Sequence, residues 1–260
     1  MTGIYMNNLN NKTALICGAT TGIGLAVAQN FVAYGAKVII TGRRESGEDT
    51  ASKIGAQFIR SDVSVEAEVD TCFAEAEERL GKLDVLVINA GIAEDEGSIE
   101  EFPSERMKSI VEVNLNGVFY SLKYGPRHMN DGGSIINTGS VAGSGATHAG
   151  TGVYAATKAA GAYLARTAAI ENAPRRIRVN SICPAIIAGT GMMIDDDGSD
   201  EAKFLGTLTA FGRMGHLDEV VGLYNFLASE ASTFITGQEI RVDGGLTAGI
   251  SLPIFEAIGS

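Results

Sequence analysis

A tyrosine, a lysine and a serine near the middle of the chain could together move a proton. Tyr154 and Lys158 are four residues apart, so on a helix they lie on one face, one turn from each other. A phenol is a weak acid near neutral pH, because its unperturbed pKa is about 10. A neighbouring ammonium favours the phenolate and lowers that pKa toward the working range. Ser140 lies upstream and could polarise a substrate oxygen, so the three groups suit the interconversion of an alcohol and a carbonyl.

The same spacing would also arise in an ordinary helix that carries a surface lysine. The motif alone is therefore weak, and its meaning depends on the elements that position it.

Short apolar runs alternate with segments of helical periodicity along most of the chain. Strands are expected at 13–17, 37–41, 57–60, 83–88, 133–138, 177–182 and 239–242. Helices are expected at 23–34, 48–54, 66–80, 104–129 (as one helix or two), 153–172 and 217–229. This alternation predicts an α/β fold with a doubly wound parallel sheet, a Rossmann fold in three layers, as a single domain over 1–260. Residues 186–213 are expected to be irregular, and 247–260 to form a C-terminal tail.

Composition narrows the classes of function. Of the 260 residues, 45% are hydrophobic and 20% charged, as in ordinary globular proteins. The formal charge of −11 argues against nucleic acid or an anionic membrane as the main partner. Three widely spaced cysteines and three isolated histidines favour neither a disulfide framework nor a metal site. No apolar run is long enough to span a membrane and no signal peptide is recognised, so we expect a cytoplasmic protein.

A glycine-rich segment lies between the first expected strand and the first expected helix. It reads Gly18-Ala-Thr-Thr-Gly22-Ile-Gly24. Glycines there permit a tight turn and let a pyrophosphate approach the free N–H groups at the start of the helix. A simple strand–helix turn could have the same sequence, but the position directly after a first strand favours a dinucleotide site.

The end of the second expected strand bears on the choice between NAD and NADP. At about this distance from the glycines, an NAD site offers Asp or Glu to the ribose hydroxyls. This chain has Arg43 and Arg44 instead, and a guanidinium pair suits the 2′-phosphate of NADP. Glu45 follows, and one arginine could merely stack on the adenine. NADP(H) is therefore the favoured cofactor, and NAD(H) is the alternative.

The chain as a whole resembles the short-chain dehydrogenase/reductase family, in its single-domain, oligomeric branch. The resemblance extends from Thr13 to about Leu246, and its motifs follow one another in the family's order and spacing. They are Gly18-x-x-x-Gly22-Ile23-Gly24, Asp62-Val63, Asn89-Ala90-Gly91, Asn114, Ser140, Tyr154-x-x-x-Lys158, Pro184 and Asp243-Gly244-Gly245. Together these motifs identify the family far more specifically than any one of them.

The resemblance implies catalytic roles for four residues. Tyr154 would be the general acid/base, and Ser140 would hydrogen-bond the substrate oxygen. Lys158 would lower the pKa of Tyr154 and hold the nicotinamide ribose. Asn114 would hold a water in a proton relay through Lys158, or would stabilise a helix kink by bonding to backbone, and the two roles are compatible.

The resemblance also implies a set of residues that contact the cofactor. Asp62 and Val63 would meet the adenine, Asn89, Ala90 and Gly91 would line its ribose, and Ile187 would contact the nicotinamide carboxamide. The whole set comprises Gly18, Thr21, Gly22, Ile23, Gly24, Arg43, Arg44, Asp62, Val63, Asn89, Ala90, Gly91, Tyr154, Lys158, Pro184, Ile187 and Thr190.

Two segments depart from the family's pattern. Pro184 is followed by Ala185 where the family usually has Gly, and the expected threonine stands one residue later, as Thr190. Ser140 and Tyr154 are fourteen residues apart, where thirteen is common in the family. The first departure indicates either one inserted loop residue or a rearranged contact with the carboxamide, and the second indicates one extra loop residue. Neither removes a catalytic group.

The leading hypothesis is an NAD(P)-dependent alcohol dehydrogenase or carbonyl reductase that acts on a small molecule. A 3-oxoacyl-[acyl-carrier-protein] reductase is the nearest alternative, but its acidic partner would need a basic surface, and the charge of −11 weighs against it. An enoyl reductase is disfavoured, because Tyr and Lys are further apart in those relatives. The alternative from another class is a non-catalytic dinucleotide-binding regulatory protein, and the presence of Tyr154, Lys158 and Ser140 weighs against it.

The surroundings of the site allow two further expectations. Residues 186–213 should cover the substrate pocket as a lid, and the apolar part of the tail, 251–258, should lie against a neighbouring subunit. The helix at 153–172 is rich in alanine all round, so its outer face is small and apolar where a solvated helix shows charge. The resemblance implies a homotetramer, and this helix is the expected contact between subunits.

Overall fold

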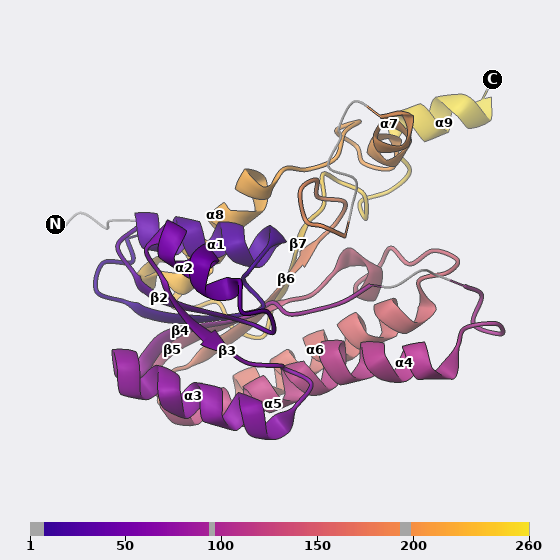
Figure 1. Cartoon of the computed structure of the whole chain (residues 1–260). Helices are drawn as coiled ribbons and strands as arrows, with labels where there is room; N and C mark the ends of the chain where they lie inside the picture. The colour runs from indigo at the N-terminus through magenta and orange to yellow at the C-terminus, as the bar shows by residue number, and fades with distance from the viewer. Residues whose placement is uncertain (1–7, 94–96, 193–198, 260) are drawn as a thin grey trace, which may run out of the picture.

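Seven parallel strands form one sheet in the computed structural model of the protein, in the order β3-β2-β1-β4-β5-β6-β7 (Figure 1). The structure describes residues 8–93, 97–192 and 199–259. The strands are β1 (Thr13–Cys17), β2 (Lys37–Gly42), β3 (Gln57–Arg60), β4 (Leu83–Ile88), β5 (Met129–Thr138), β6 (Arg178–Pro184) and β7 (Glu239–Val242).

Helices connect the strands and follow the last of them. The α-helices are α1 (Gly22–Ala33), α2 (Gly47–Ile54), α3 (Glu66–Leu80), α4 (Ser104–Val111), α5 (Gly117–Tyr124), α6 (Gly152–Glu171), α7 (Asp200–Thr207), α8 (Leu217–Ala228) and α9 (Leu252–Gly259). Within the described ranges, no helix is both long enough and apolar enough to cross a membrane.

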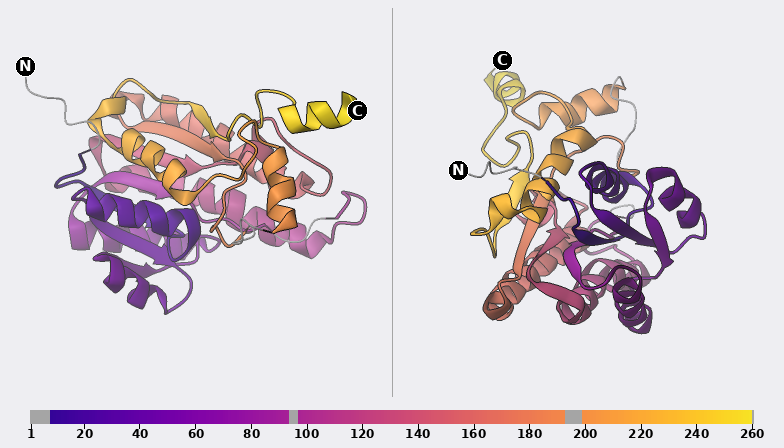
Figure 2. Two further views of the ribbon diagram at one scale, coloured as in Figure 1. Left: turned by 90° about the horizontal axis from the view of Figure 1, so that it is seen from above. Right: turned by 90° about the vertical axis from the view of Figure 1, so that its left-hand side faces the viewer.

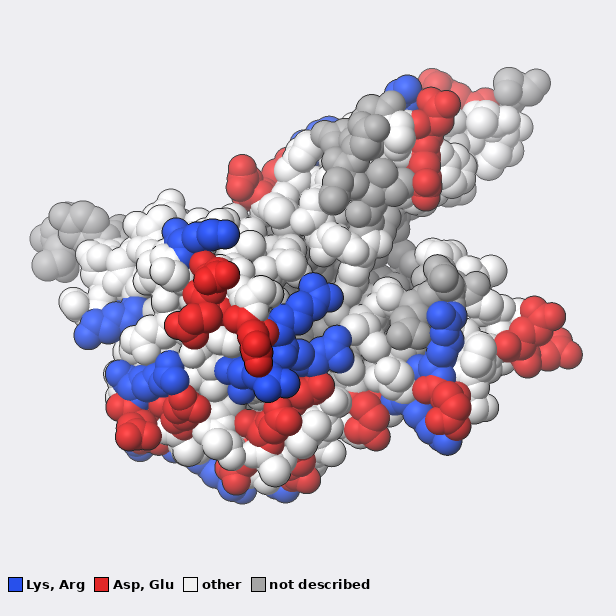
Figure 3. All heavy atoms as spheres, viewed as in Figure 1, with Lys and Arg blue, Asp and Glu red and all other residues white. Residues whose placement is uncertain are grey.

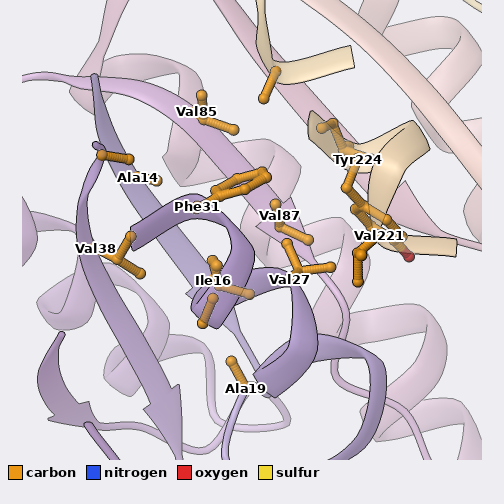
Figure 4. Close-up of a cluster of buried hydrophobic side chains, with 14 of the residues drawn as sticks. Ala14, Ile16, Ala19, Val27, Phe31, Val38, Val85, Val87, Val221 and Tyr224 are labelled. Carbon is orange, nitrogen blue, oxygen red and sulfur yellow. The ribbon is translucent and has the colours of Figure 1, made fainter. Parts of the chain in front are cut away.

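Different helices cover the two faces of the sheet (Figure 2). On one face, α1 and α8 pack over a buried cluster that includes Ile16, Val87 and Tyr224 (Figure 4). On the other face, α3, α5 and α6 pack over a second cluster that includes Leu15 and Leu86. Successive strand residues point to opposite faces, so a sheet covered on both sides needs strands that are apolar throughout. The expected doubly wound Rossmann fold in three layers is confirmed.

The strand order reverses between β1 and β4, with β2 and β3 on one side and β5 to β7 on the other. In open sheets of this kind, ligands bind outside the carboxyl ends of the strands at the point of reversal. Gly18 directly follows β1 and Asn89 directly follows β4. The fold therefore brings both expected cofactor residues to this point.

Four regions differ from the elements that the sequence predicts. The helical stretch expected at 104–129, as one helix or two, ends at Tyr124, and a single π-helical turn at Glu112–Asn116 separates its two helices. Strand β5 begins at Met129, because Met129 pairs with Leu83 across an irregularity in the register. Helices α7 and α9 lie in the two segments for which the sequence predicts none.

Helix α7 has a local cause that its sequence contains. The side chain of Ser199 caps the helix by accepting a hydrogen bond of 3.0 Å from the N–H of Ala202. Asp200 and Glu201 occupy the first turn, where the helix dipole favours negative charge. Residues 193–198, which include Asp195, Asp196 and Asp197, lie outside the described residues.

Candidate active site

The groups expected to carry the chemistry come from the end of β5 and from the first turns of α6. Lys158 Nζ donates a hydrogen bond of 2.9 Å to the carbonyl oxygen of Thr138, the last residue of β5. The same Nζ lies 5.8 Å from the centre of the Tyr154 ring. The structure therefore brings the phenol and the amine together on one face of α6.

Lys158 is buried almost completely, with 6% of its surface exposed. Burial disfavours the charged form and lowers the pKa of Lys158 to about 8, while the nearby Cys183 thiol acts weakly in the opposite direction. The amine is thus largely protonated at neutral pH. Since little water screens it, its charge acts strongly on the neighbouring phenol.

Ser140 lies two residues beyond β5 and begins a short 3₁₀ turn, Val141–Gly143. Its Oγ accepts a hydrogen bond of 3.2 Å from the N–H of Ala142. This bond uses one lone pair of the hydroxyl, so the hydroxyl hydrogen can still be donated. A substrate oxygen is a suitable acceptor for it.

Asn114 lies buried in the π-helical turn between α4 and α5. Its Oδ1 accepts a hydrogen bond of 2.8 Å from the N–H of Ile92. Its Nδ2 donates to the carbonyl oxygen of Ile92 at 2.9 Å and to Thr157 Oγ1 at 3.3 Å. The side chain thus joins the loop after β4 to α6, which agrees with the backbone-bonding role considered for it. The sequence gives no signal for the π-helical turn itself.

The glycine-rich segment forms a cradle that larger residues would fill. Gly18 has φ +77°, and a Cβ at this position would lie 2.5 Å from Ala90 Cα. Gly22 has φ +58°, and its Cβ would lie 2.7 Å from the carbonyl oxygen of Thr190. The φ values and the close approaches both require glycine. The cradle lies at the start of α1, whose unpaired N–H groups favour a phosphate, so these residues fit a dinucleotide.

Basic side chains lie at the ends of β2 and β3. Arg43 and Arg44 are exposed, and Arg43 Nη1 lies 3.9 Å from Asp62 Oδ2. Arg60, which the sequence analysis does not single out, donates from Nε to the carbonyl oxygen of Arg43 at 3.1 Å. Figure 3 shows Lys and Arg side chains gathered on this face, beside the hollow between the body and the C-terminal elements. The surroundings therefore suit an anionic group.

The chain after β6 returns to the glycine cradle. Ile187 is buried and forms a bridge with Gly215, and Thr190 Oγ1 donates to the carbonyl oxygen of Ile187 at 3.2 Å. The proximity of Thr190 to Gly22 places this segment over the start of α1. Thr190 therefore lies at the glycine cradle although it stands one residue later than the family's threonine. Pro184 ends β6 and is buried.

The remaining expected residues lie around the same opening. Thr21 is the N-cap of α1, Ile23 and Gly24 are in its first turn, and Val63 packs near Gly117. Gly91 lies close to both Lys158 Nζ and Asn114 Oδ1, at 3.1 and 3.4 Å from a Cβ built on it. Within the part of the chain that is described, no group of three or more His, Cys, Asp or Glu is arranged to hold a metal ion.

Thr138 is the residue of this region that sequence reasoning missed most clearly. Its carbonyl oxygen accepts from Lys158, and its Oγ1 donates to Asn89 Oδ1 at 3.1 Å. Its only signal in the sequence is its position two residues before Ser140, at the end of an expected strand.

Comparisons with known proteins cover nearly the whole chain. A family model described as "Enoyl-(Acyl carrier protein) reductase" matches residues 18–247. The NADP-dependent (R)-specific alcohol dehydrogenase of Lentilactobacillus kefiri is 37% identical over 252 residues, which cover 93% of this chain and 99% of that protein. The meso-2,3-butanediol dehydrogenase of Serratia marcescens is 34% identical over 249 residues, which cover 94% of this chain and 98% of that protein.

The solved structures agree with these relatives. The short-chain dehydrogenase/reductase from Serratia marcescens BCRC 10948 superposes with a TM-score of 0.86 at 31% identity, covering 92% of this chain and 99% of that one. Fold, coverage and the order of the motifs all lead to the same assignment. The chain belongs to the short-chain dehydrogenase/reductase family of oxidoreductases.

Proposed function

We propose that the protein interconverts a secondary alcohol and a ketone with NADP(H), and that Tyr154 is the general acid/base. The observation that carries the proposal is the buried amine of Lys158, one helical turn from Tyr154 and beside a glycine cradle that fits a dinucleotide. The alcohol and butanediol dehydrogenases among its relatives support the same reaction class.

In the direction of reduction, Tyr154 donates a proton to the substrate oxygen. When bound, the nicotinamide supplies the hydride, which is the step that the protein side chains cannot perform. The ammonium of Lys158 stabilises the phenolate that remains on Tyr154, and it acts strongly because the burial of Lys158 leaves little water to screen its charge. Ser140 donates a hydrogen bond to the same substrate oxygen and orients it. Alcohol oxidation reverses these steps.

Asn114 has a positioning role in this proposal, through its side-chain bonds to the loop after β4 and to Thr157. Because those bonds occupy the side chain, a water relay toward Lys158 would depend on the main-chain carbonyl of Asn114. This relay is the part of the expected mechanism that rests on the family resemblance alone.

NADP(H) is the proposed cofactor, with its 2′-phosphate beside Arg43 and Arg44. Both side chains are exposed at the end of β2, where they can reach an anion, and the Lentilactobacillus kefiri relative is NADP-dependent. Gly18, Gly22 and Gly24 would receive the pyrophosphate. Asp62 and Asn89 would lie beside the adenine and its ribose, and NAD(H) remains the alternative.

The proposed substrate is a small alcohol or ketone, not an acyl chain on a carrier protein. The family model is described by an enoyl reductase, yet Tyr154 and Lys158 stand four residues apart, unlike in enoyl reductases of the family. The net charge of −11 also disfavours an acidic carrier protein as partner. Residues 186–213 would act as the lid over this substrate, and a cytoplasmic homotetramer is the proposed working form.

A substrate panel with NADPH and NADH, combined with one substitution, tests the proposal. Tyr154→Phe retains the ring but removes the proton donor, so turnover of the best ketone should fall by about 10²-fold or more while NADPH still binds. Tyr34→Phe is the control, because Tyr34 lies exposed at the end of α1; its turnover should equal that of wild type.

Two outcomes would contradict the proposal. Turnover of Tyr154→Phe within a few-fold of wild type would remove Tyr154 from the mechanism. Binding of NADPH without turnover of any alcohol, ketone or 3-oxoacyl thioester would favour the non-catalytic regulatory alternative.

A further inference from the structure

Tyr224 is a buried tyrosine whose hydroxyl the mechanism above does not use. It lies on α8 with 0% of its surface exposed, among the side chains between that helix, α1 and the sheet (Figure 4). Its hydroxyl lies 2.8 Å from Thr138 Oγ1. A phenol that only filled the core would need no hydroxyl, so the bond to Thr138 calls for a physical account.

The neighbouring groups decide which hydroxyl donates. The carbonyl oxygen of Gly18 can only accept, so the Asn89 group 2.7 Å from it is the amide nitrogen. Asn89 Oδ1 then faces Thr138 Oγ1 at 3.1 Å, and Thr138 must give its single hydroxyl hydrogen to it. Tyr224 is therefore the donor to Thr138. Burial raises the pKa of the Tyr224 phenol, so the hydroxyl keeps this hydrogen throughout the working pH range.

The result is one directed series of hydrogen bonds, from Tyr224 to Thr138, from Thr138 to Asn89, and from Asn89 to Gly18. The series begins in the core between α8 and the sheet, and it ends at the carbonyl of Gly18 in the glycine cradle. The amide of Asn89 also supports the first turn of α1, since a Cβ on Gly24 would lie 2.6 Å from Asn89 Nδ2.

Thr138 joins this series to the catalytic helix. Its main-chain carbonyl oxygen accepts from Lys158 while its side chain donates to Asn89. A rotation of the Thr138 side chain would release the Asn89 amide, and with it the bond that holds the carbonyl of Gly18. The hydrogen bond from the Tyr224 hydroxyl to Thr138 opposes that rotation.

We propose that Tyr224 is a positioning residue for cofactor binding, which holds Thr138, Asn89 and the glycine cradle in the arrangement that receives NADP(H). This inference rests on the proposed placement of the cofactor over Gly18 and Gly24. If it is correct, removal of the Tyr224 hydroxyl weakens NADPH binding by more than it reduces the free energy of unfolding.

A purely structural role is the competing explanation, and the chain offers a matched control for it. Ser134 lies four residues before Thr138 on the same strand and the same face, and it also bonds to α8. Its Oγ donates to the carbonyl oxygen of Leu227 at 2.7 Å, and the residue is 1% exposed. Ser134→Ala thus removes a buried β5–α8 hydrogen bond that does not lead to Asn89.

The test measures the NADPH dissociation constant by fluorescence titration, and the Tm, on the full-length protein. Tyr224→Phe should raise the dissociation constant about three- to tenfold, as expected for one lost hydrogen bond. Ser134→Ala should lower the Tm about as much as Tyr224→Phe does, and it should leave the NADPH dissociation constant unchanged. Thr138→Val should raise the dissociation constant, and Tyr224→Phe added to it should then change the constant less than 1.5-fold, because its partner is already absent.

The outcomes separate this inference from the proposed function. An unchanged NADPH dissociation constant in Tyr224→Phe or in Thr138→Val overturns the inference, as do equal effects of Tyr224→Phe in both backgrounds. If Tyr224→Phe fails to fold, Thr138→Val alone decides. The double variant Arg43→Ala, Arg44→Ala serves as the cofactor control. Its selective loss of NADPH binding keeps the proposed site intact even when the Tyr224 inference fails.

Discussion

Lys158 carries its charge in a place that water hardly reaches, and this has opposite consequences for stability and for chemistry. Burial lowers the pKa of Lys158 to about 8 from its ordinary 10.5. Below pH 8 the folded protein must hold a buried charge, which costs free energy. Between about 8 and 10.5 the folded protein releases this proton while the unfolded chain retains it. The contribution of Lys158 to the free energy of unfolding therefore becomes more favourable as the pH rises through that window.

The reduction of a ketone should respond to pH in the opposite direction. As the pH rises through about 8, Lys158 loses the charge that stabilises the Tyr154 phenolate, so kcat/KM for NADPH-dependent reduction should fall about tenfold per pH unit. The measurement is the pH profile of kcat/KM from pH 6.5 to 9.5, with the Tm recorded at each pH.

The two profiles together make the prediction specific. Loss of activity that follows the Tm would identify unfolding as its cause. A flat rate between pH 7 and 9.5 would show that the proton on Lys158 does not matter. Lys158→Arg stays charged throughout this range, so whatever activity it retains should lack the inflection.

At the scale of elements, the first turn of α1 and the middle of α8 contain glycines with contrasting surroundings. Gly24 lies against the carbonyl of Gly18 and the amide of Asn89, whereas Gly222 is exposed with nothing within 4 Å of a built Cβ. Gly24→Ala should therefore displace the cradle, lower the Tm and weaken NADPH binding at least tenfold. Gly222→Ala should stabilise its helix by about 0.5–1 kcal/mol and leave binding unchanged. Thermal unfolding and NADPH titration of both variants check this, and equal behaviour of the two would contradict it.

The elements that the sequence predicted well are those whose signal is local. Buried parallel strands such as Leu83–Ile88 are continuous apolar runs, and helices such as Glu66–Leu80 show clear periodicity. The start of β5 was missed because Met129-Asn-Asp-Gly-Gly is polar and turn-like, and only pairing with β4 makes it a strand. The capped start of α7 at Ser199 could have been recognised from its acidic first turn.

The arrangement of the candidate site residues could be predicted from the sequence only where their signal is local. The glycine cradle and the spacing of Tyr154 and Lys158 are local patterns, and the fold brings them to one edge of the sheet. Thr138 and Tyr224 are 86 residues apart. The positioning role proposed for these two residues depends on that contact, and no pattern of sequence spacing reveals it.

At the scale of the whole molecule, two of the surfaces that expose apolar side chains bear on assembly. On the outer side of α6, Tyr163 and Ile170 are 65% and 74% exposed, next to exposed alanines at 156 and 159. Helix α9 extends from the body beside α7 (Figure 2) and exposes Leu252, Phe255 and Ile258. A monomer would leave both surfaces in water, so we expect self-association to cover them.

The outer face of α6 is the surface on which that association can be tested most directly. At micromolar concentration, the wild type should sediment as a species of about four times the chain mass of 27.1 kDa. Ala159→Arg places a long charged side chain in the middle of the face and should dissociate the assembly, at little cost to the fold of each chain because Ala159 is exposed. Ala74→Arg is the control, since Ala74 is exposed on α3, and it should sediment like the wild type. A wild type that sediments near 27.1 kDa with full activity would refute the tetramer, and an intact assembly of Ala159→Arg would exclude α6 as its contact.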